Sequence, residues 1–231
     1  MLKKIYFTFH FLLSTFLVNS QVVINEYSAS NFDSHLDNYG EYEDWVELYN
    51  TTNSDIDLNG WSLTDKPSNL SKWSFPGSFI VSANSVAIVY CSGLNELVGG
   101  VAHTNFKITQ TKPGEVFVLS DAGGNIIDSA RAVPAQKSHS RGRDVNGGTT
   151  WSVFTTATPN TNNSGAMLEY APLPIFSQSS GYYSAPFDLT LSCADPNALL
   201  YYTTDGSRPD NSSNLYTGPF NISSTSVVKA V

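Results

Sequence analysis

Six acidic residues between positions 33 and 47 could supply oxygen ligands to a metal ion. They are Asp33, Asp37, Glu41, Glu43, Asp44 and Glu47. Hard cations such as calcium bind several carboxylate and carbonyl oxygens from one loop. The spacing does not match an EF-hand loop, so a solvated acidic loop is the favoured interpretation. Four of the six are kept as candidate calcium ligands: Asp33, Asp37, Glu41 and Asp44.

The residue types of hydrolytic catalysis are present, but no motif joins them. Beyond residue 20, the histidines His35, His103 and His139 lie far apart, and none has a second His or a Cys at zinc-ligand spacing. No Gly-x-Ser-x-Gly segment marks a nucleophilic serine, and a pair of glycosidase carboxylates would need a shaped cleft. We therefore expect no catalytic residue, no enzymatic activity and no cofactor apart from the calcium alternative.

Aromatic side chains offer a different chemistry, because their faces can stack on sugars. Four tryptophans lie in or beside expected strands, where packing in the core or at its rim is favoured. They are Trp45, Trp61, Trp73 and Trp151. Two pairs of adjacent tyrosines differ, since neighbours in a strand point to opposite faces and one of each pair is then exposed. The candidates for a binding surface are Tyr182, Tyr183, Tyr201 and Tyr202.

The composition places these residues in a folded β-protein. Hydrophobic residues make up 41% of the 231 residues, aromatic residues 13% and charged residues only 14%, which excludes a disordered or solvated chain. Ser, Thr, Asn, Gly and Tyr fill the polar positions, as in many extracellular β-domains. The net charge of −8 opposes binding to phosphate backbones, so no nucleic-acid partner is expected.

The first twenty residues have the pattern of a secretory signal peptide. Lys3 and Lys4 precede an apolar stretch from Ile5 to Val18, and Val18-Asn19-Ser20 supplies the cleavage positions. The apolar stretch is shorter than the roughly 20 residues of a spanning helix, so cleavage after Ser20 is favoured over an uncleaved anchor. We expect a secreted protein, extracellular or at the cell surface, with no transmembrane span after cleavage.

Short strands separated by turn residues follow from Val22 onward, as is typical of a sandwich or barrel. The clearest are residues 22–27, 45–49, 61–64, 72–75, 85–91, 115–120 and 126–130. Asp121-Ala122-Gly123-Gly124-Asn125 predicts a hairpin between the last two. No window shows sustained helical spacing, so the predicted class is all-β.

A seam near Thr156 to Pro174 divides the chain, because residues 157–165 are rich in Asn and Thr and predict a surface segment or linker. Beyond it, Leu189 and Leu191 alternate with polar residues and predict a second, small β-domain. Its final strand has nothing after it, so we expect the chain to be truncated there. Cys91 and Cys193 fall in different domains and are expected as two buried thiols, with an interdomain bridge as the alternative.

Ordered motifs in the first domain resemble the bacterial lamin-tail domain. They are Val23-Ile24-Asn25-Glu26, Glu43-Asp44-Trp45-Val46-Glu47-Leu48-Tyr49-Asn50, Leu58-Asn59-Gly60-Trp61-Ser62-Leu63-Thr64-Asp65 and Thr158-Pro159-Asn160. The resemblance covers residues 22–163 and implies an immunoglobulin-like β-sandwich. It also implies a structural hydrogen-bond or ion-pair role for Glu26 and Glu47.

The second domain resembles the C-terminal β-domain of chitobiases and β-hexosaminidases. The motifs are Leu200-Tyr201-Tyr202-Thr203-Thr204-Asp205-Gly206-Ser207-Arg208-Pro209, Tyr216-Thr217-Gly218-Pro219-Phe220 and Val228-Lys229-Ala230. The resemblance implies an incomplete small sandwich at residues 174–231, after a linker at 164–173. The layout is similar to that of large secreted Bacteroidetes-type proteins.

The leading hypothesis is a secreted, non-catalytic adhesion, tethering or spacer module at the cell envelope, with a protein or a cell-surface polysaccharide as its partner. One alternative is the N-terminal accessory region of a larger extracellular enzyme, either a hydrolase or a kinase-like protein of the spore-coat-protein-H type. Another is a polysaccharide-binding module that uses exposed Tyr or Trp side chains.

Overall fold

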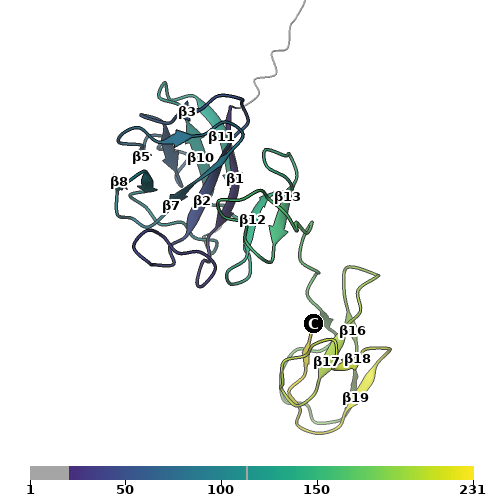
Figure 1. The fold of residues 1–231 in the computed structure, drawn as a ribbon. Helices are drawn as coiled ribbons and strands as arrows, with labels where there is room; N and C mark the ends of the chain where they lie inside the picture. The colour runs from purple at the N-terminus through teal and green to yellow at the C-terminus, as the bar shows by residue number, and fades with distance from the viewer. Residues whose placement is uncertain (1–20, 113) are drawn as a thin grey trace, which may run out of the picture. The chain divides into compact units, whose positions relative to one another are not determined.

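The computed structural model describes residues 21–112 and 114–231, so the predicted signal peptide at 1–20 lies outside the described residues. All of the regular secondary structure described is β, which confirms the predicted class. Within these two ranges, no helix is long and apolar enough to cross a membrane. The chain divides into two units, the first ending at Leu168 and the second running from Glu169 to Val231 (Figure 1).

The larger sheet of the first unit has seven strands, all paired antiparallel except β7 with β9. From edge to edge they are β13 (Trp151–Phe154), β12 (Ser140–Arg143), β1 (Val22–Ser28), β2 (Trp45–Asn50), β7 (Val86–Tyr90), β9 (Val101–His103) and β8 (Glu96–Val98). The long central strands β1 and β2 are rich in Val, Ile, Leu and aromatic residues, which pack well on a pleated sheet.

A second sheet of four strands completes the sandwich. Its order is β11 (Ile126–Arg131), β10 (Val116–Ser120), β4 (Ser62–Thr64) and β5 (Trp73–Ser74). The predicted hairpin is the antiparallel pair of β10 and β11. Strands β3 (Ile56–Asp57) and β6 (Ile80–Val81) form a separate pair.

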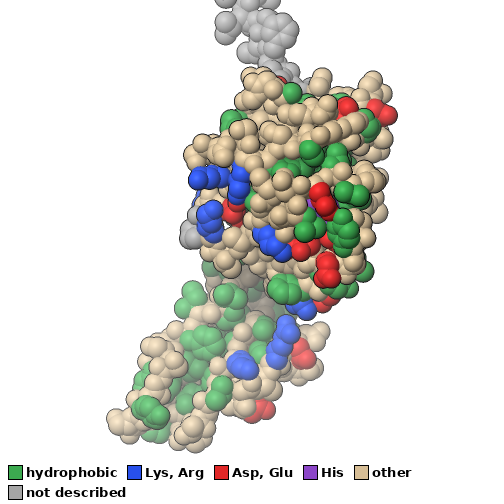
Figure 2. All heavy atoms as spheres, turned by 90° about the vertical axis from the view of Figure 1, so that its left-hand side faces the viewer, with side chains coloured by type: hydrophobic (Ala, Val, Ile, Leu, Met, Phe, Trp, Pro, Cys, Tyr) green, Lys and Arg blue, Asp and Glu red, His purple; other side chains and the backbone are tan. Residues whose placement is uncertain are grey.

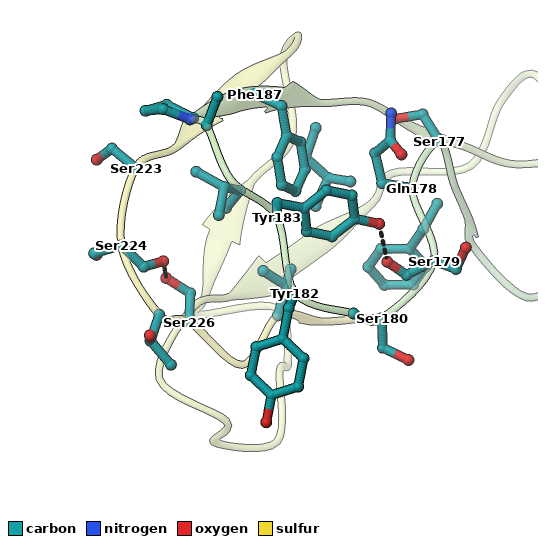
Figure 3. A pocket seen from close by; sticks show the side chains of 18 of the residues that line it. Ser177, Gln178, Ser179, Ser180, Tyr182, Tyr183, Phe187, Ser223, Ser224 and Ser226 are labelled. Atoms are coloured by element: carbon teal, nitrogen blue, oxygen red, sulfur yellow. Dashed lines mark hydrogen bonds between the residues drawn. The ribbon is translucent and has the colours of Figure 1, made fainter.

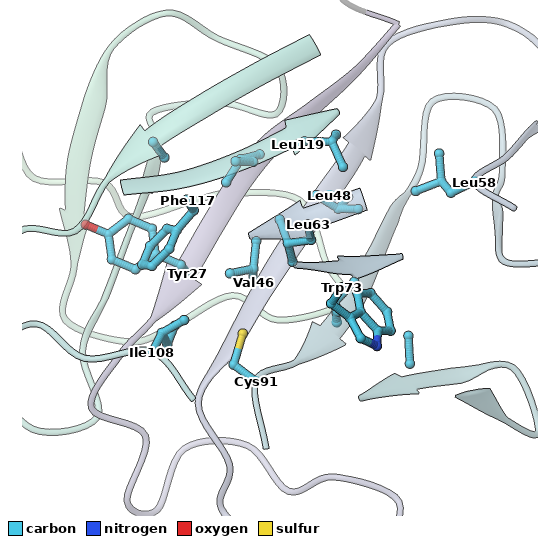
Figure 4. Packing of buried hydrophobic residues seen from close by; sticks show 14 of the residues in the cluster. Tyr27, Val46, Leu48, Leu58, Leu63, Trp73, Cys91, Ile108, Phe117 and Leu119 are labelled. Carbon is cyan, nitrogen blue, oxygen red and sulfur yellow. The ribbon is translucent and has the colours of Figure 1, made fainter. Parts of the chain in front are cut away.

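The core of the first unit lies between these sheets and contains twenty buried hydrophobic residues (Figure 4). Val46 and Leu48 of β2 face it, together with Phe117 and Leu119 of β10. Because side chains alternate along a strand, Trp45 and Glu47 point to the other face of the seven-stranded sheet. Trp45 packs there in a smaller cluster with Ile88 and Tyr90.

A β-bulge changes this alternation in β1. The pairing register with β2 shifts between Ile24 and Glu26, so Ile24 and Tyr27 both reach the core although they lie three residues apart. The Asp128 carboxylate accepts the Ile24 N–H at 2.8 Å and also pairs with Arg143 at 2.8 Å. The bulge thereby leaves Glu26 directly opposite Glu47 of β2.

The segment that follows β13 belongs to the first unit. Val153 and Met167 exchange backbone hydrogen bonds of 2.7 and 2.8 Å, and Asn163 is buried. The division between the units therefore falls between Leu168 and Glu169, within the range 164–173 that the sequence suggested as a linker.

The second unit is built from short strand pairs. Its strands are β14 (Ile175–Phe176), β15 (Phe187–Leu189), β16 (Leu191–Ser192), β17 (Tyr201–Thr203), β18 (Asn214–Leu215), β19 (Phe220–Ile222) and β20 (Lys229–Ala230). Only Leu189, Leu191 and Leu200 are fully buried in its hydrophobic cluster. Both cysteines are free: Cys91 is buried in the first unit and Cys193 is half-buried in the second.

Candidate binding site

Two buried glutamates face each other on the outer face of the seven-stranded sheet. Glu26 of β1 and Glu47 of β2 are register partners, and both are fully buried. Like charges directly opposite on neighbouring strands destabilise a sheet. The pKa of Glu47 is raised to about 8, mainly by burial; the Glu26 carboxylate contributes to the rise, and hydrogen bonds from Asn25 and Asn160 oppose it. At neutral pH Glu47 is therefore largely protonated, which removes most of the repulsion.

The segment after β13 supplies the donors that satisfy this pair. The Thr158 N–H donates to Glu26 Oε1 at 2.9 Å and its hydroxyl to Oε2 at 2.6 Å. The Asn160 N–H donates to Glu47 Oε2 at 2.7 Å. Since these oxygens are covered by the chain itself, the pair anchors a segment and leaves no access for a substrate. The hydrogen-bond role implied for Glu26 and Glu47 is confirmed.

Gly142 of β12 makes room for the Glu26 side chain. It is the register partner of Glu26, and a Cβ at this position would lie 2.9 Å from the Asn25 carbonyl oxygen and 3.0 Å from Glu26 Cβ. A side chain there would displace the buried carboxylate. Position 142 therefore requires glycine, because β1 approaches β12 closely there.

A second polar cluster in the first unit contains a serine, a histidine and an asparagine. The His103 imidazole is fully buried, with Nδ1 3.0 Å from Ser92 Oγ and Nε2 2.7 Å from Asn38 Oδ1. The composition is that of a hydrolytic triad, but a nucleophile must meet its substrate. Ser92 is buried, and its Oγ accepts the Leu94 N–H at 3.2 Å. This geometry supports a turn rather than chemistry.

Sequence reasoning missed this cluster because its members come from separate segments. The loop before β2 folds against β7 and β9, so His35 Nε2 lies 3.0 Å from the Tyr90 hydroxyl, and the His103 ring stacks on the Tyr90 ring with centroids 5.2 Å apart. Their separation along the chain predicts that the histidines are distant from each other. The topology brings two of them, His35 and His103, into contact with the same tyrosine.

The four candidate calcium ligands are not gathered into one site. Asp33 pairs with Lys137 at 3.0 Å, whereas Asp37 Oδ1 accepts the backbone N–H groups of Tyr39 and Glu41. Asp44 accepts the Asn31 N–H at 2.9 Å, and burial raises its pKa to about 6. The Glu41 side chain is exposed. In the described ranges, no three His, Cys, Asp or Glu side chains lie close enough to hold a metal ion.

A pocket of about 990 Å³ lies in the second unit. Strands β15 and β19 are antiparallel, with Phe187 opposite Ile222, so the loop that enters β15 and the loop that leaves β19 emerge at the same end. These two loops form the walls (Figure 3). Residues 176–187, 189 and 222–228 line the pocket.

The lining is uncharged. It contains seven serines, one threonine and one glutamine, with four aromatic residues and no Asp, Glu, Lys, Arg or His. The aromatic residues are Phe176, Tyr182, Tyr183 and Phe187. Eleven of the twenty lining residues are Ser, Thr, Gln or Tyr, so the pocket is more polar than a typical small-molecule site. The lining contains no carboxylate, imidazole, amine or guanidinium group, and the phenol hydroxyls of Tyr182 and Tyr183 are its titratable groups.

Two of the four candidate tyrosines line this pocket. The Tyr183 hydroxyl donates to the Ser179 carbonyl, and its ring packs on Phe187 with centroids 4.5 Å apart. Tyr182 points away from Tyr183 and is fully exposed, at 108% of the reference area (Figure 3). Both lie in a loop and not in a strand, so their exposure has a different cause from the alternation we expected.

The other two candidates lie outside the pocket, on β17. Tyr202 is half-buried and stacks on Phe220, with centroids 4.2 Å apart. Tyr202 therefore contributes to the hydrophobic cluster. Tyr201 is also half-buried and pairs in register with Leu215 of β18.

Comparison with known families identifies two matching regions. The model of the Lamin Tail Domain matches residues 18–133, which is about half of the chain, and the model of the Chitobiase/beta-hexosaminidase C-terminal domain matches residues 178–231. These are the two families that the motifs resemble, in the same order. No curated protein matches the chain. The first match ends before β12 and β13, although these strands extend the seven-stranded sheet.

Proposed function

The chain belongs to the lamin tail domain family, and from this membership and the geometry above we propose that it is a secreted, non-catalytic tethering module that binds its ligand in the pocket of the second unit. The observation that carries the proposal is the uncharged, aromatic lining of this pocket. Tyr182 presents a fully exposed ring there, and the lining residues include no titratable acid or base other than the tyrosines.

The first unit supports a role as a spacer. Its polar clusters are closed: the Glu26–Glu47 pair is covered by Thr158 and Asn160, and Ser92 is buried. Its stability rests on the packed core between the sheets. A closed, well-packed unit of this kind would suit a spacer.

The signal-peptide pattern of residues 1–20 supports export to the cell envelope. The same pocket would also serve an accessory module of a larger extracellular enzyme, because such a module holds a ligand without converting it. Both family models that match the chain describe single domains, which is also what such an accessory module would contain.

Co-sedimentation of the mature chain, residues 21–231, with washed cell-envelope material tests the proposal. We expect the protein to sediment with the envelope and Tyr182→Ala to reduce the bound fraction at least fivefold. Tyr42→Ala is the matched control, because Tyr42 is an exposed tyrosine of the first unit. Absence of sedimentation, equal loss in both variants, or chemical conversion of the bound material would overturn the proposal.

A further inference from the structure

We infer that the pocket of the second unit binds an uncharged saccharide chain, with one sugar ring stacked on Tyr182. This inference rests on the proposed binding function and names the class of ligand. It depends on three features of the pocket: an exposed ring, unpaired hydroxyl and amide groups, and the absence of charge from the lining.

The two adjacent tyrosines have different roles: Tyr183 packs in the pocket wall, and Tyr182 is exposed for contact with a ligand. Tyr183 is fixed by its hydrogen bond to Ser179 and by its contact with Phe187. Tyr182, the next residue, has no ring partner among the described residues and extends into solvent (Figure 3). Tyrosine provides a large, rigid and amphipathic contact area at low conformational cost. The apolar face of a sugar ring fits such a surface.

Polar groups that line the same pocket as Tyr182 are available to the hydroxyl groups of a sugar. Ser177 and Ser226 hold the walls, since Ser177 Oγ accepts the Thr190 N–H at 2.9 Å and Ser226 Oγ donates to the Ser224 carbonyl at 3.0 Å. The side chains of Gln178, Ser180 and Ser223 have no hydrogen-bond partner in the described part of the protein and line the same pocket. Hydroxyl and amide groups both donate and accept, which suits a ligand made of hydroxyl groups.

The charge distribution selects against ionised sugars. Anionic chains are bound through Arg or Lys, and the lining contains neither. The chain as a whole carries a net charge of −8, which repels anions further. A cationic chain would need lining carboxylates, which are also absent from the residues of this pocket. On the face of the second unit that Figure 2 shows, hydrophobic and uncharged atoms cover much of the surface and charged side chains are few.

The walls are held by backbone contacts, and the volume suits a chain of sugars. The Gly206 N–H donates to the Val227 carbonyl at 2.9 Å and the Val227 N–H to the Thr204 carbonyl at 3.2 Å, which fixes one wall. About 990 Å³ lies at the upper end of the range of small-molecule sites, so the pocket accommodates a short oligosaccharide rather than one ring.

Affinity electrophoresis of the mature chain in gels that contain a defined polysaccharide tests this inference. The neutral probes are a β-glucan, a mannan and chitin oligosaccharides coupled to the gel; polygalacturonate is the anionic probe and chitosan the cationic one. We expect retardation by at least one neutral probe, unchanged between 50 and 500 mM salt because the lining is uncharged. Tyr182→Ala should weaken the apparent affinity at least tenfold, whereas Tyr182→Phe, which keeps the ring, and the control Tyr42→Ala should retain it.

Retardation by the charged probes alone, or retention by a neutral probe that Tyr182→Ala leaves unchanged, would overturn the inference. The co-sedimentation assay distinguishes a failure of this inference from a failure of the proposed function. If Tyr182 is needed for co-sedimentation but no neutral probe retards the protein, the tethering function is supported and the saccharide ligand is excluded. Loss of co-sedimentation after protease treatment of the envelope would then identify a protein ligand. If both assays are negative, both proposals fall.

Discussion

The two units use their polar and aromatic residues in opposite ways. In the first, twenty hydrophobic residues form one core, and carboxylate, imidazole and amide side chains are buried in hydrogen-bonded clusters. In the second, three leucines are fully buried, while a tyrosine and several serines remain open to solvent around a pocket. Buried polar groups must all find partners, so they fix a structure and leave nothing free for a ligand. Unpaired groups at a surface stay available for binding.

The chain contains a separate probe for each unit, which lets the comparison be tested in the intact protein. All four tryptophans, at positions 45, 61, 73 and 151, belong to the first unit. Fluorescence therefore reports on the unfolding of that unit alone. Each unit also has one free thiol, Cys91 in the first and Cys193 in the second, whose labelling rates report on local opening.

The largest effect is expected from Glu26→Ala. The substitution leaves the Ser140 hydroxyl and both Thr158 donors without their acceptor. Unsatisfied buried donors cost about 1–3 kcal/mol each, so we expect the first unit to lose about 3 kcal/mol of unfolding free energy in urea, measured by tryptophan fluorescence. The labelling rate of Cys193 should not change.

The conservative variant Glu26→Gln is the control for this substitution, since it keeps an acceptor at the same place. We expect it to cost less than about 1 kcal/mol. If Glu26→Ala is tolerated as well as Glu26→Gln, the segment around Thr158 is not held by this carboxylate, and the contrast between a closed and an open unit is wrong.

The next largest effect is expected from pH, because the stability of the two units should depend on pH in different ways. The pKa of Glu47 is raised to about 8, and the pKa values of Glu26 and Asp44 are raised in the same direction, each mainly by burial. These three groups thus hold more protons in the folded first unit than in the unfolded chain between about pH 4.5 and 8, while His35, whose pKa is lowered by burial, acts in the opposite direction. The stability that the three groups contribute is highest at the acidic end of this window and falls as the pH rises, with a slope of at most about 1.4 kcal/mol per pH unit for each group.

In the second unit, hydrogen bonds from Ser207 and Ser212 lower the pKa values of Asp205 and Asp210. The stability that these exposed groups contribute is present above their unfolded pKa and is lost only as the pH falls through lower values. Cys193 labelling should therefore be flat from pH 5 to 8 after correction for thiolate formation. Glu47→Gln should flatten the fluorescence-detected slope of the first unit, and an unchanged slope would remove Glu47 as its cause.

Gly206→Ala is expected to have a smaller effect, confined to the second unit. Gly206 has φ +82°, and a Cβ there would lie 3.3 Å from Val227 Cβ. The left-handed conformation costs a non-glycine residue about 1–2 kcal/mol, so Cys193 labelling should accelerate and saccharide retention should weaken as the Val227 wall moves. Gly218→Ala is the control, because no heavy atom lies within 4 Å of its added Cβ. Equal effects of the two variants would mean that this wall is not set by Gly206.

Seven strands of the first unit could be predicted from local patterns, whereas β3, β6, β8, β9, β12, β13 and the polar clusters were not predicted. Alternation placed strands at 22–27, 45–49 and 115–120, which the structure has as Val22–Ser28, Trp45–Asn50 and Val116–Ser120. The bulge that sets Glu26 opposite Glu47 depends on Asp128 and Arg143, more than a hundred residues away. Such contacts leave no periodic signal in one sequence.

The pocket could be predicted only in part. Adjacency singled out Tyr182 and Tyr183, but the same rule also chose Tyr201 and Tyr202, which are half-buried on β17. The serines in the loop that leaves β19 meet the loop that enters β15 because β15 and β19 pair. Strand pairing between segments that are far apart decides which loops meet, and the sequence pattern does not specify it.

The smallest effect on stability should come from Tyr182→Ala, the variant with the largest expected effect on binding. An exposed side chain without partners contributes little to folding, so the change in unfolding free energy should be within about 0.5 kcal/mol by either probe. Tyr183→Ala makes the contrast, since it removes the packing on Phe187 and the hydrogen bond to Ser179 and should accelerate Cys193 labelling. If Tyr182→Ala destabilises the second unit as much as Tyr183→Ala, then Tyr182 is part of its packing, and its loss of binding would reflect a damaged fold. If stability is unchanged and binding is lost, the exposed ring itself makes the contact.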